Sequence, residues 1–490
     1  MKFSILKSTT ISLIILLFLS SFSLPGAKDK AQKYIDRELK TDSLFNNAIV
    51  GICAINEQGE KIAQWNSNLP MLTASTLKTI TTGVGLHYLG SDFKFTTRIS
   101  YSGTIKDSIL NGNIHIIGGA DPTLGSEDTV AFKVDSIFGI WAKEIKLCGI
   151  KQVNGNIVAD DSYFKREMLP DTWSWGNLGP YYGSAASGLS FFENAQKFIL
   201  KPGKNIGDSA KVEAIYPYVP GLKIINKVTT EAAKTADKSA YYAQDLSLCS
   251  KYIGTIPIDK AYIKSDNSNK FPHLSCAWHF KKYLEEKAKI SVSGSIEDIE
   301  NIKFGTILFN ICQTYSPELW KIVNVTNRIS NNFFAETILK TIGKQMTKVG
   351  SIDSSLVAVK RILTDMGVNV WGLEMADGSG LSRQNYVSPE FFCNYYTKMK
   401  ESANFAKFFE SLPIPGNGGT LKNVLKNASK EDKEKIHAKS GSLSGVKCYA
   451  GYVQSKSNGL VKFAILVNNY TAPTSKLQTK IEQFMLELTK

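Results

Sequence analysis

Hydrophobic and polar residues alternate over 48–66, near the beginning of the chain, with a turn at 57–59. This period of two predicts a β-hairpin. From Ala74 the apolar residues recur every three or four positions until Gly90, which predicts a helix that ends at this glycine. The first predicted elements are therefore a strand pair and an apolar helix.

The end of the chain has the same order of strands and then a helix. Residues 436–440, 447–453 and 461–468 are predicted strands, and an Asn-Gly turn at 458–459 joins the last two. A closing helix carries an apolar stripe, formed by Leu477, Ile481, Phe484, Met485 and Leu488. The simplest arrangement is one antiparallel sheet that brings both ends of the chain together, with helices packed on it.

The middle of the chain differs from both ends. From 96 to 275, short β-prone runs alternate with turns rich in Gly, Asn, Asp and Ser. We interpret this segment as an inserted β-rich region. Residues 28–95 and 276–490 are then the two parts of a discontinuous main domain of the α+β class.

Residues 1–27 have the order of a secretory signal peptide. Lys2 and Lys7 precede an apolar run over 11–19, and small residues follow it. The run is shorter than the ~20 residues that a spanning helix requires. We therefore predict export to the periplasm or the extracytoplasmic envelope, with an uncleaved membrane anchor as the alternative.

Composition narrows the classes of partner. The chain of 490 residues has a formal net charge of +14, but its basic residues are spread out and match no nucleic-acid-binding motif. We expect no nucleic-acid partner and only a weak association with an anionic cell envelope. The seven cysteines form no Cys-x-x-Cys pair, so we expect no metal site, and no motif indicates a cofactor.

The first candidate for catalysis is Ser75, three residues before Lys78 in the predicted helix. Positions three apart lie on one face of a helix, so the lysine amine can act as a base on the serine hydroxyl. The lysine then needs a pKa that is depressed by burial or by a nearby cation.

The Ser-x-x-Lys spacing is weak evidence by itself, because it recurs along the chain. The other serines with this spacing are Ser4, Ser91, Ser162 and Ser444. Ser75 differs from them because it begins an apolar helix directly after a loop. Backbone N–H groups at a helix N-terminus can stabilise a developing oxyanion.

Two further motifs carry candidate polar groups. Ser-Asn-Asn at 330–332 precedes a helix-like run, where the hydroxyl can relay a proton and the amide can hold a substrate carbonyl; the alternative is a simple N-cap. Lys-Ser-Gly at 439–441 ends a predicted strand, where the cation and the hydroxyl can bind a terminal carboxylate. The alternative there is a lysine that faces solvent.

Together these motifs resemble a known family. The order Ser-x-x-Lys, Ser-x-Asn, Lys-Ser/Thr-Gly is typical of penicillin-interacting serine enzymes. Other similar segments lie at 118–124, 155–160, 377–383 and 439–451. From about residue 45 onward, the chain resembles the D-alanyl-D-alanine carboxypeptidase/endopeptidase family S13, of the penicillin-binding protein 4 type. The interval of 255 residues between the first two motifs is also similar to this family, whose members carry two extra domains there.

The resemblance implies a fold and an activity. We expect the penicillin-binding-protein/β-lactamase-like transpeptidase fold, with an antiparallel sheet flanked by helices, a helical lobe and two small inserted domains. The expected activity is that of a serine-type D-alanyl-D-alanine carboxypeptidase on peptidoglycan stem peptides; whether it also cuts cross-links as an endopeptidase is not decided by the sequence. β-Lactam antibiotics are expected to be covalent inhibitors. The alternatives are a β-lactamase or esterase of the same superfamily, and a wall-binding protein without catalysis.

The resemblance also implies roles for individual residues. Ser75 is expected to form the acyl-enzyme, with Lys78 as general base and Ser330 as proton relay. The residues expected to hold the substrate, its terminal carboxylate or the oxyanion are Asn332, Lys439, Ser440 and Ser442. Those that match the family's pocket for the peptide side chain are Trp173, Tyr181, Leu443 and Ser444. For the two aromatic residues, packing in the core or a loop is the alternative.

Overall fold

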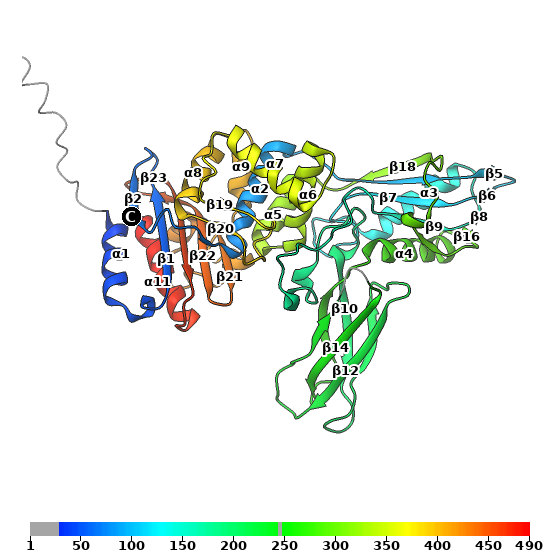
Figure 1. Ribbon diagram of the computed structural model, residues 1–490, viewed down its shortest axis with the longest axis horizontal. Coiled ribbons are helices and arrows are strands. Elements are labelled where there is room, and N and C mark those ends of the chain that lie inside the picture. Colours follow the sequence, from blue (N-terminus) through cyan, green and yellow to red (C-terminus); the bar gives the residue numbers. More distant parts are fainter. Residues whose placement is uncertain (1–28, 244–246) are drawn as a thin grey trace, which may run out of the picture.

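A central sheet joins the two ends of the chain. The computed structural model describes residues 29–243 and 247–490, so the predicted signal peptide at 1–27 lies outside the described residues. The strands of the sheet are β1 (Ile49–Ile55), β2 (Lys61–Trp65), β21 (Ile436–Leu443), β22 (Val446–Ser455) and β23 (Gly459–Asn468). They are all antiparallel, in the order β2-β1-β23-β22-β21 (Figure 1). The predicted antiparallel sheet and the α+β class are confirmed.

Both faces of this sheet are buried. On one face, Phe463 and Ile465 of β23 share a hydrophobic cluster with the terminal helices α1 (Lys30–Thr41) and α11 (Thr474–Leu488). Ala464, between them in sequence, belongs instead to the core of the helices on the other face. Successive side chains of a strand point to opposite faces, so one strand serves both cores.

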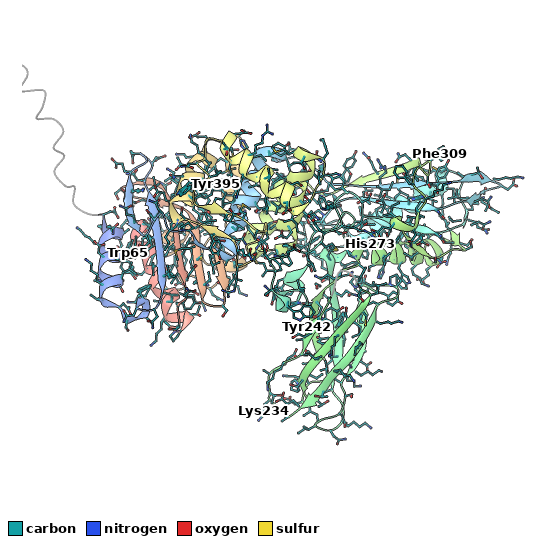
Figure 2. The ribbon with its side chains drawn as sticks, viewed as in Figure 1. Trp65, Lys234, Tyr242, His273, Phe309 and Tyr395 are labelled. Carbon is teal, nitrogen blue, oxygen red and sulfur yellow. The ribbon has the colours of Figure 1, made fainter. Side chains whose placement is uncertain are left out.

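A helical lobe covers the second face of the sheet (Figure 1). Its helices are α2 (Lys78–Leu89), α5 (Leu319–Ile329), α6 (Asn332–Thr347), α7 (Ile352–Asp365), α8 (Pro389–Lys400) and α9 (Phe405–Ser411), with the short α10 (Lys430–Glu434) nearby in sequence. Helix α2 is buried from Lys78 to Leu86 and ends, as predicted, before Gly90, whose φ of +89° favours glycine. Tyr395 of α8, labelled in Figure 2, donates a 2.9 Å hydrogen bond to the Thr79 carbonyl of α2. No helix in the described part of the chain is long and apolar enough to cross a membrane.

A small sheet connects the lobe with the segment before α2. It contains β3 (Met71–Leu72), β20 (Tyr386–Val387) and β19 (Leu373–Glu374). The strand β20 lies between the other two and pairs with both in antiparallel fashion. Because β20 pairs with β3, the sheet holds the segments before and after β20 close to the turn that precedes α2.

Between α2 and α5 the chain forms two further bodies, which project from the helical lobe (Figure 1). The first contains the sheets β16-β8-β6-β5 and β17-β9-β7-β4-β18, together with helices α3 (Val134–Leu147) and α4 (Pro272–Glu286). Its strands are β4 (Thr96–Tyr101), β5 (Thr104–Lys106), β6 (Ile109–Asn111), β7 (Ile114–Gly119), β8 (Gln152–Asn154), β9 (Ile157–Asp160), β16 (Ser291–Val292), β17 (Ile296–Asp298) and β18 (Phe309–Tyr315).

The second body contains the sheets β11-β10-β15 and β12-β14-β13. Its strands are β10 (Ala195–Lys201), β11 (Lys211–Tyr216), β12 (Lys223–Glu231), β13 (Ala240–Tyr242), β14 (Cys249–Pro257) and β15 (Ile263–Ser268). Each body has a hydrophobic cluster of its own, one around Trp141 and the other around Tyr252. In Figure 2, His273 and Phe309 mark the first body, and Tyr242 and Lys234 mark the second.

The inserted region is longer than the sequence indicated. The predicted boundary at 275 falls inside α4, and β16, β17 and β18 pair with β8, β9 and β4. The insertion therefore extends from 96 to 315, and the main domain resumes only with α5. The boundary prediction is corrected for a physical reason: local composition does not reveal that β18 pairs with a strand about 200 residues earlier.

Candidate active site

Ser75 lies in a 3₁₀ turn, Ala74–Leu77, that continues directly into α2. Ala74 has a φ of +45°, a strained conformation for a residue with a side chain. Lys78 begins α2 and is fully buried, and its Nζ lies 3.0 Å from Ser75 Oγ. The other serines with this spacing in the described part of the chain all lie in turns, at Ser91, Ser162 and Ser444.

Two further oxygen atoms surround the Lys78 amine. Asn332 Oδ1 and the carbonyl oxygen of Ser379 each lie 2.6 Å from Nζ. Both oxygens can only accept hydrogen bonds, so a neutral amine donates to both and turns its lone pair toward the Ser75 hydroxyl. This geometry would allow the amine to take the proton of Ser75.

The electrostatic environment also favours the neutral form of this amine. Burial lowers the pKa of Lys78 to about 7, although Asp377 and Glu336 act in the opposite direction. Burial likewise holds the pKa of Lys439 well below its usual range, and the charges of Lys78 and Lys447 lower it further. A base with a pKa near 7 is substantially deprotonated at neutral pH.

The Ser-Asn-Asn motif spans the junction between α5 and α6. Ser330 ends α5 in the left-handed conformation, with a φ of +63°, and Asn331 caps α6 by accepting a 3.0 Å hydrogen bond from a backbone N–H of its first turn. Asn332 begins α6 and also donates a 2.8 Å hydrogen bond to the Tyr182 carbonyl. The motif caps a helix, as the alternative predicted, while Asn332 in addition contacts Lys78.

Lys439 lies on β21, the edge strand that contacts the turn carrying Ser75. Its side chain is fully buried, and Nζ donates to Ser330 Oγ (2.9 Å) and to the Ser440 carbonyl (2.8 Å). The alternative of a solvent-facing lysine is therefore wrong. Lys439 connects the Ser-Asn-Asn motif with the strand beside the nucleophile.

Gly441 allows β21 to approach the nucleophile closely. A Cβ at this position would lie 2.5 Å from the Thr73 carbonyl oxygen and 3.0 Å from the Thr76 nitrogen, so only glycine fits. Ser442 follows on the exposed side of the strand, and its Oγ accepts a 3.0 Å hydrogen bond from Lys447. Because β21 is the last strand of its sheet, alternate backbone N–H groups point away from the sheet.

The four residues predicted for the side-chain pocket have different environments. Trp173 is buried, donates from Nε1 to Asp377 Oδ2 (2.9 Å) and packs in one cluster with Leu443, which matches the alternative of core packing. Tyr181 is 59% exposed and lines a cavity of about 260 Å³ together with Glu193, which accepts a hydrogen bond from Asn331. Ser444 is exposed in the turn after β21.

Two buried carboxyl groups near Lys78, those of Asp377 and Glu336, were not predicted as site residues. Asp377 lies in a segment that contributed to the family resemblance, but without a role. Glu336 lies on α6, four residues after Asn332. An acidic residue at this spacing, in an otherwise apolar run, is the feature of the sequence that could have identified it as a site residue. Within residues 29–243 and 247–490, no group of three or more His, Cys, Asp or Glu side chains is placed to hold a metal ion.

The fold and the site define a class of protein. A serine and a lysine one helical turn apart, a Ser-Asn-Asn motif between two helices and a lysine on an edge strand are the arrangement of penicillin-interacting serine enzymes. The model of the D-Ala-D-Ala carboxypeptidase 3 (S13) family matches residues 31–489, and the chain belongs to this family of serine-type peptidases. The resemblance expected from the sequence is confirmed.

Individual relatives agree with this assignment. The chain is 27% identical over 452 residues to a D-alanyl-D-alanine carboxypeptidase of Actinomadura sp. (strain R39), covering 88% of this chain and 80% of the relative. It is 25% identical over 476 residues to the D-alanyl-D-alanine carboxypeptidase DacB of Haemophilus influenzae, covering 94% and 92%. The crystal structure of penicillin binding protein 4 (dacB) from Haemophilus influenzae has a TM-score of 0.78 at 23% identity, covering 94% of this chain and 97% of that chain. This match confirms the expected fold.

Proposed function

We propose that the protein removes the terminal D-alanine from peptidoglycan stem peptides through an acyl-enzyme on Ser75. The observation that carries the proposal is the environment of Lys78, whose amine contacts Ser75 Oγ and two oxygens that can only accept hydrogen bonds. The burial that lowers its pKa supports the same role. No second nucleophile is required for this chemistry.

Acylation begins when Ser75 Oγ attacks the carbonyl carbon of the D-Ala–D-Ala bond and Lys78 takes its proton. Lys439 and Ser440 bind the terminal carboxylate, which orients the bond. The backbone N–H groups of Ser75 and Ser442 stabilise the oxyanion. Ser330 then relays the proton taken up by Lys78 to the leaving amine, so that the lysine is neutral again; the C–N bond breaks and D-alanine departs, which leaves an ester on Ser75.

Deacylation restores the enzyme when a water molecule attacks the ester and Ser75 regains its proton. A β-lactam acylates the same serine, but its leaving amine stays tethered to the acyl group, so the adduct persists. We further propose that Asn332 orients the peptide and that Tyr181, Leu443 and Ser444 line the site for its side chain. Since stem peptides lie outside the cytoplasmic membrane, we infer that the protein is exported, in keeping with the signal peptide predicted at 1–27.

The test is intact-mass measurement of the protein after incubation with penicillin, followed by peptide mapping. We expect one adduct, on the peptide that contains Ser75, and no adduct on a Ser75→Ala variant. The matched control is Ser91→Ala, which removes a serine of the same spacing that lies in a turn. An adduct on another peptide would overturn the choice of nucleophile, and rapid hydrolysis of the penicillin would favour the β-lactamase alternative.

A further inference from the structure

Helix α6 carries a buried polar stripe toward the active site. Asn332, Glu336 and Lys340 follow one another at intervals of four residues, so they lie on one face of the helix. Glu336 is 3% exposed and Lys340 is 2% exposed. Buried ionisable side chains are costly unless they are paired, so each of them is expected to have a structural or functional task.

Glu336 holds the peptide segment that faces Lys78. Its Oε1 accepts hydrogen bonds from the backbone N–H groups of Gly378 (3.1 Å) and Ser379 (2.8 Å), and its Oε2 also accepts from Gly378 (3.1 Å). The carbonyl of the same Ser379 accepts the 2.6 Å hydrogen bond from Lys78 Nζ. The carboxyl group of Glu336 thus fixes the position of the Ser379 carbonyl oxygen, which is one of the three oxygens around the Lys78 amine.

We propose that Glu336 is a positioning residue for acylation: its carboxyl group holds the Gly378–Ser379 peptide so that the Ser379 carbonyl orients the Lys78 amine toward Ser75. This proposal rests on the function proposed for Ser75 and Lys78. Both hydrogen-bond acceptors of the Lys78 amine then depend on α6. Asn332 is part of this helix, and Ser379 is held in place by Glu336 of the same helix.

The second buried carboxyl group has a different task. Asp377 Oδ1 accepts from the Gly380 N–H (2.7 Å) and from Asn385 Nδ2 (2.8 Å), and Oδ2 accepts from the Ser382 N–H (2.6 Å) and Trp173 Nε1 (2.9 Å). These bonds fold the 377–385 segment on itself and attach it to Trp173. Glu336 attaches that segment to α6, on the side of Lys78.

The charges around Glu336 give its role a signature in the pH dependence. Lys78, Asp377 and Lys340 face Glu336, and the charge of Lys78 in turn lowers the pKa of Lys439. Burial and Asp377 raise the pKa of Glu336 to about 8, so its carboxyl group is largely protonated over the pH range in which Lys78, with a pKa of about 7, loses its proton. A neutral replacement of Glu336 therefore leaves the charge around Lys78 unchanged on the acid limb of a pH–rate profile.

The experiment measures the second-order rate of acylation by a chromogenic cephalosporin between pH 5 and 9. Glu336→Gln keeps the size of the side chain, but its single oxygen cannot replace both carboxylate oxygens. We expect the plateau rate to fall by about tenfold or more, because small displacements of a catalytic group are costly. We also expect the acid limb of the profile to keep its position, because Glu336 is already largely protonated there and Lys78 loses no negative neighbour.

Two variants separate positioning from general damage to the fold. Glu336→Asp keeps a carboxyl group but shortens the side chain, so we expect a lower plateau with the acid limb near its original position. Thr341→Val is the matched control, because Thr341 is fully buried on the same helix and bonds only within it, to the Thr337 carbonyl. We expect this control to leave both the plateau and the acid limb unchanged.

The outcomes distinguish this inference from the proposed function. A folded Glu336→Gln protein with the original plateau and acid limb overturns the role of Glu336 alone. A lower plateau with the acid limb shifted to higher pH also overturns it, since the exposure of Lys78 that raises its pKa indicates structural damage. Undiminished acylation in a Lys78→Met variant would instead overturn the proposed function itself.

Discussion

At the scale of single residues, the role of base that we propose for Lys78 predicts a pH dependence. In this role the amine must be neutral, and burial lowers the pKa of Lys78 to about 7. We therefore expect the acylation rate to rise with pH up to about 7 and then to level off. Below that pH the rate should fall about tenfold per pH unit, because each unit reduces the neutral fraction tenfold. Rates of acylation by a fluorescent penicillin between pH 5 and 9 measure this dependence.

Lys78→Arg is the informative control for that profile. Arginine stays protonated in proteins, so it cannot take the serine proton at any pH in this range. We expect no acylation by this variant from pH 5 to 9, although it keeps a cation in the site. A wild-type rate that does not change between pH 5 and 9 would contradict the assignment of Lys78 as the base.

At the scale of elements, the position of β21 beside the nucleophile depends on Gly441. In Gly441→Ala the new Cβ would meet backbone atoms at 2.5 Å and 3.0 Å, which cannot move as a flexible side chain can. We expect β21 to shift away from the turn that carries Ser75, a loss of about 1–3 kcal/mol in stability and a strongly reduced acylation rate. Thermal unfolding and acylation kinetics measure the two effects.

Gly176→Ala is the control for this substitution. A Cβ at Gly176 would have no atom within 4 Å, and the residue does not have a positive φ. We expect unchanged stability and acylation in this variant. If Gly441→Ala also acylates at the wild-type rate, β21 does not need its close approach to the nucleophile.

At the scale of the whole molecule, an ion-pair cluster joins the first and last helices. Lys480 Nζ, on α11, lies 2.7 Å from Oε2 of Glu38, near the end of α1, and 2.8 Å from Oδ2 of Asp42, just after α1. Hydrogen bonding to Lys480 holds the pKa of both carboxyl groups below their usual range. Their contribution to stability is therefore present above about pH 4 and is lost as the pH falls through their lowered pKa values.

We expect Lys480→Met to lower the free energy of unfolding by about 1 kcal/mol at pH 7, since the cluster is partly exposed. The difference from the wild type should shrink at pH 3, because the stabilisation decreases as the pH falls below the pKa values that the two carboxyl groups have in the unfolded chain. Thermal unfolding at the two pH values measures this change. Lys476→Met, at an exposed position on the same helix, should have no such effect. An equal destabilisation at both pH values would mean that Lys480 acts through packing rather than charge.

Local patterns explain which parts of the fold were predictable. The strands at both ends, the helix that ends at Gly90 and the cap at the start of α6 follow from periodicity and turn chemistry, which act over a few residues. The end of the insertion and the helices α3 and α4 were not predicted. Their assignment depends on pairing such as that of β18 with β4, which no local pattern encodes.

The same division holds at the site. The sequence by itself determined the three motifs, their order and hence the family, because these depend on residue identity and spacing. Tertiary structure decided that Lys78 and Lys439 are buried, that Glu336 holds Ser379 and that Trp173 packs in the core. The reason is physical: burial, pKa and hydrogen-bond partners are set by contacts between segments far apart in the chain, such as that of Lys78 with Asn332.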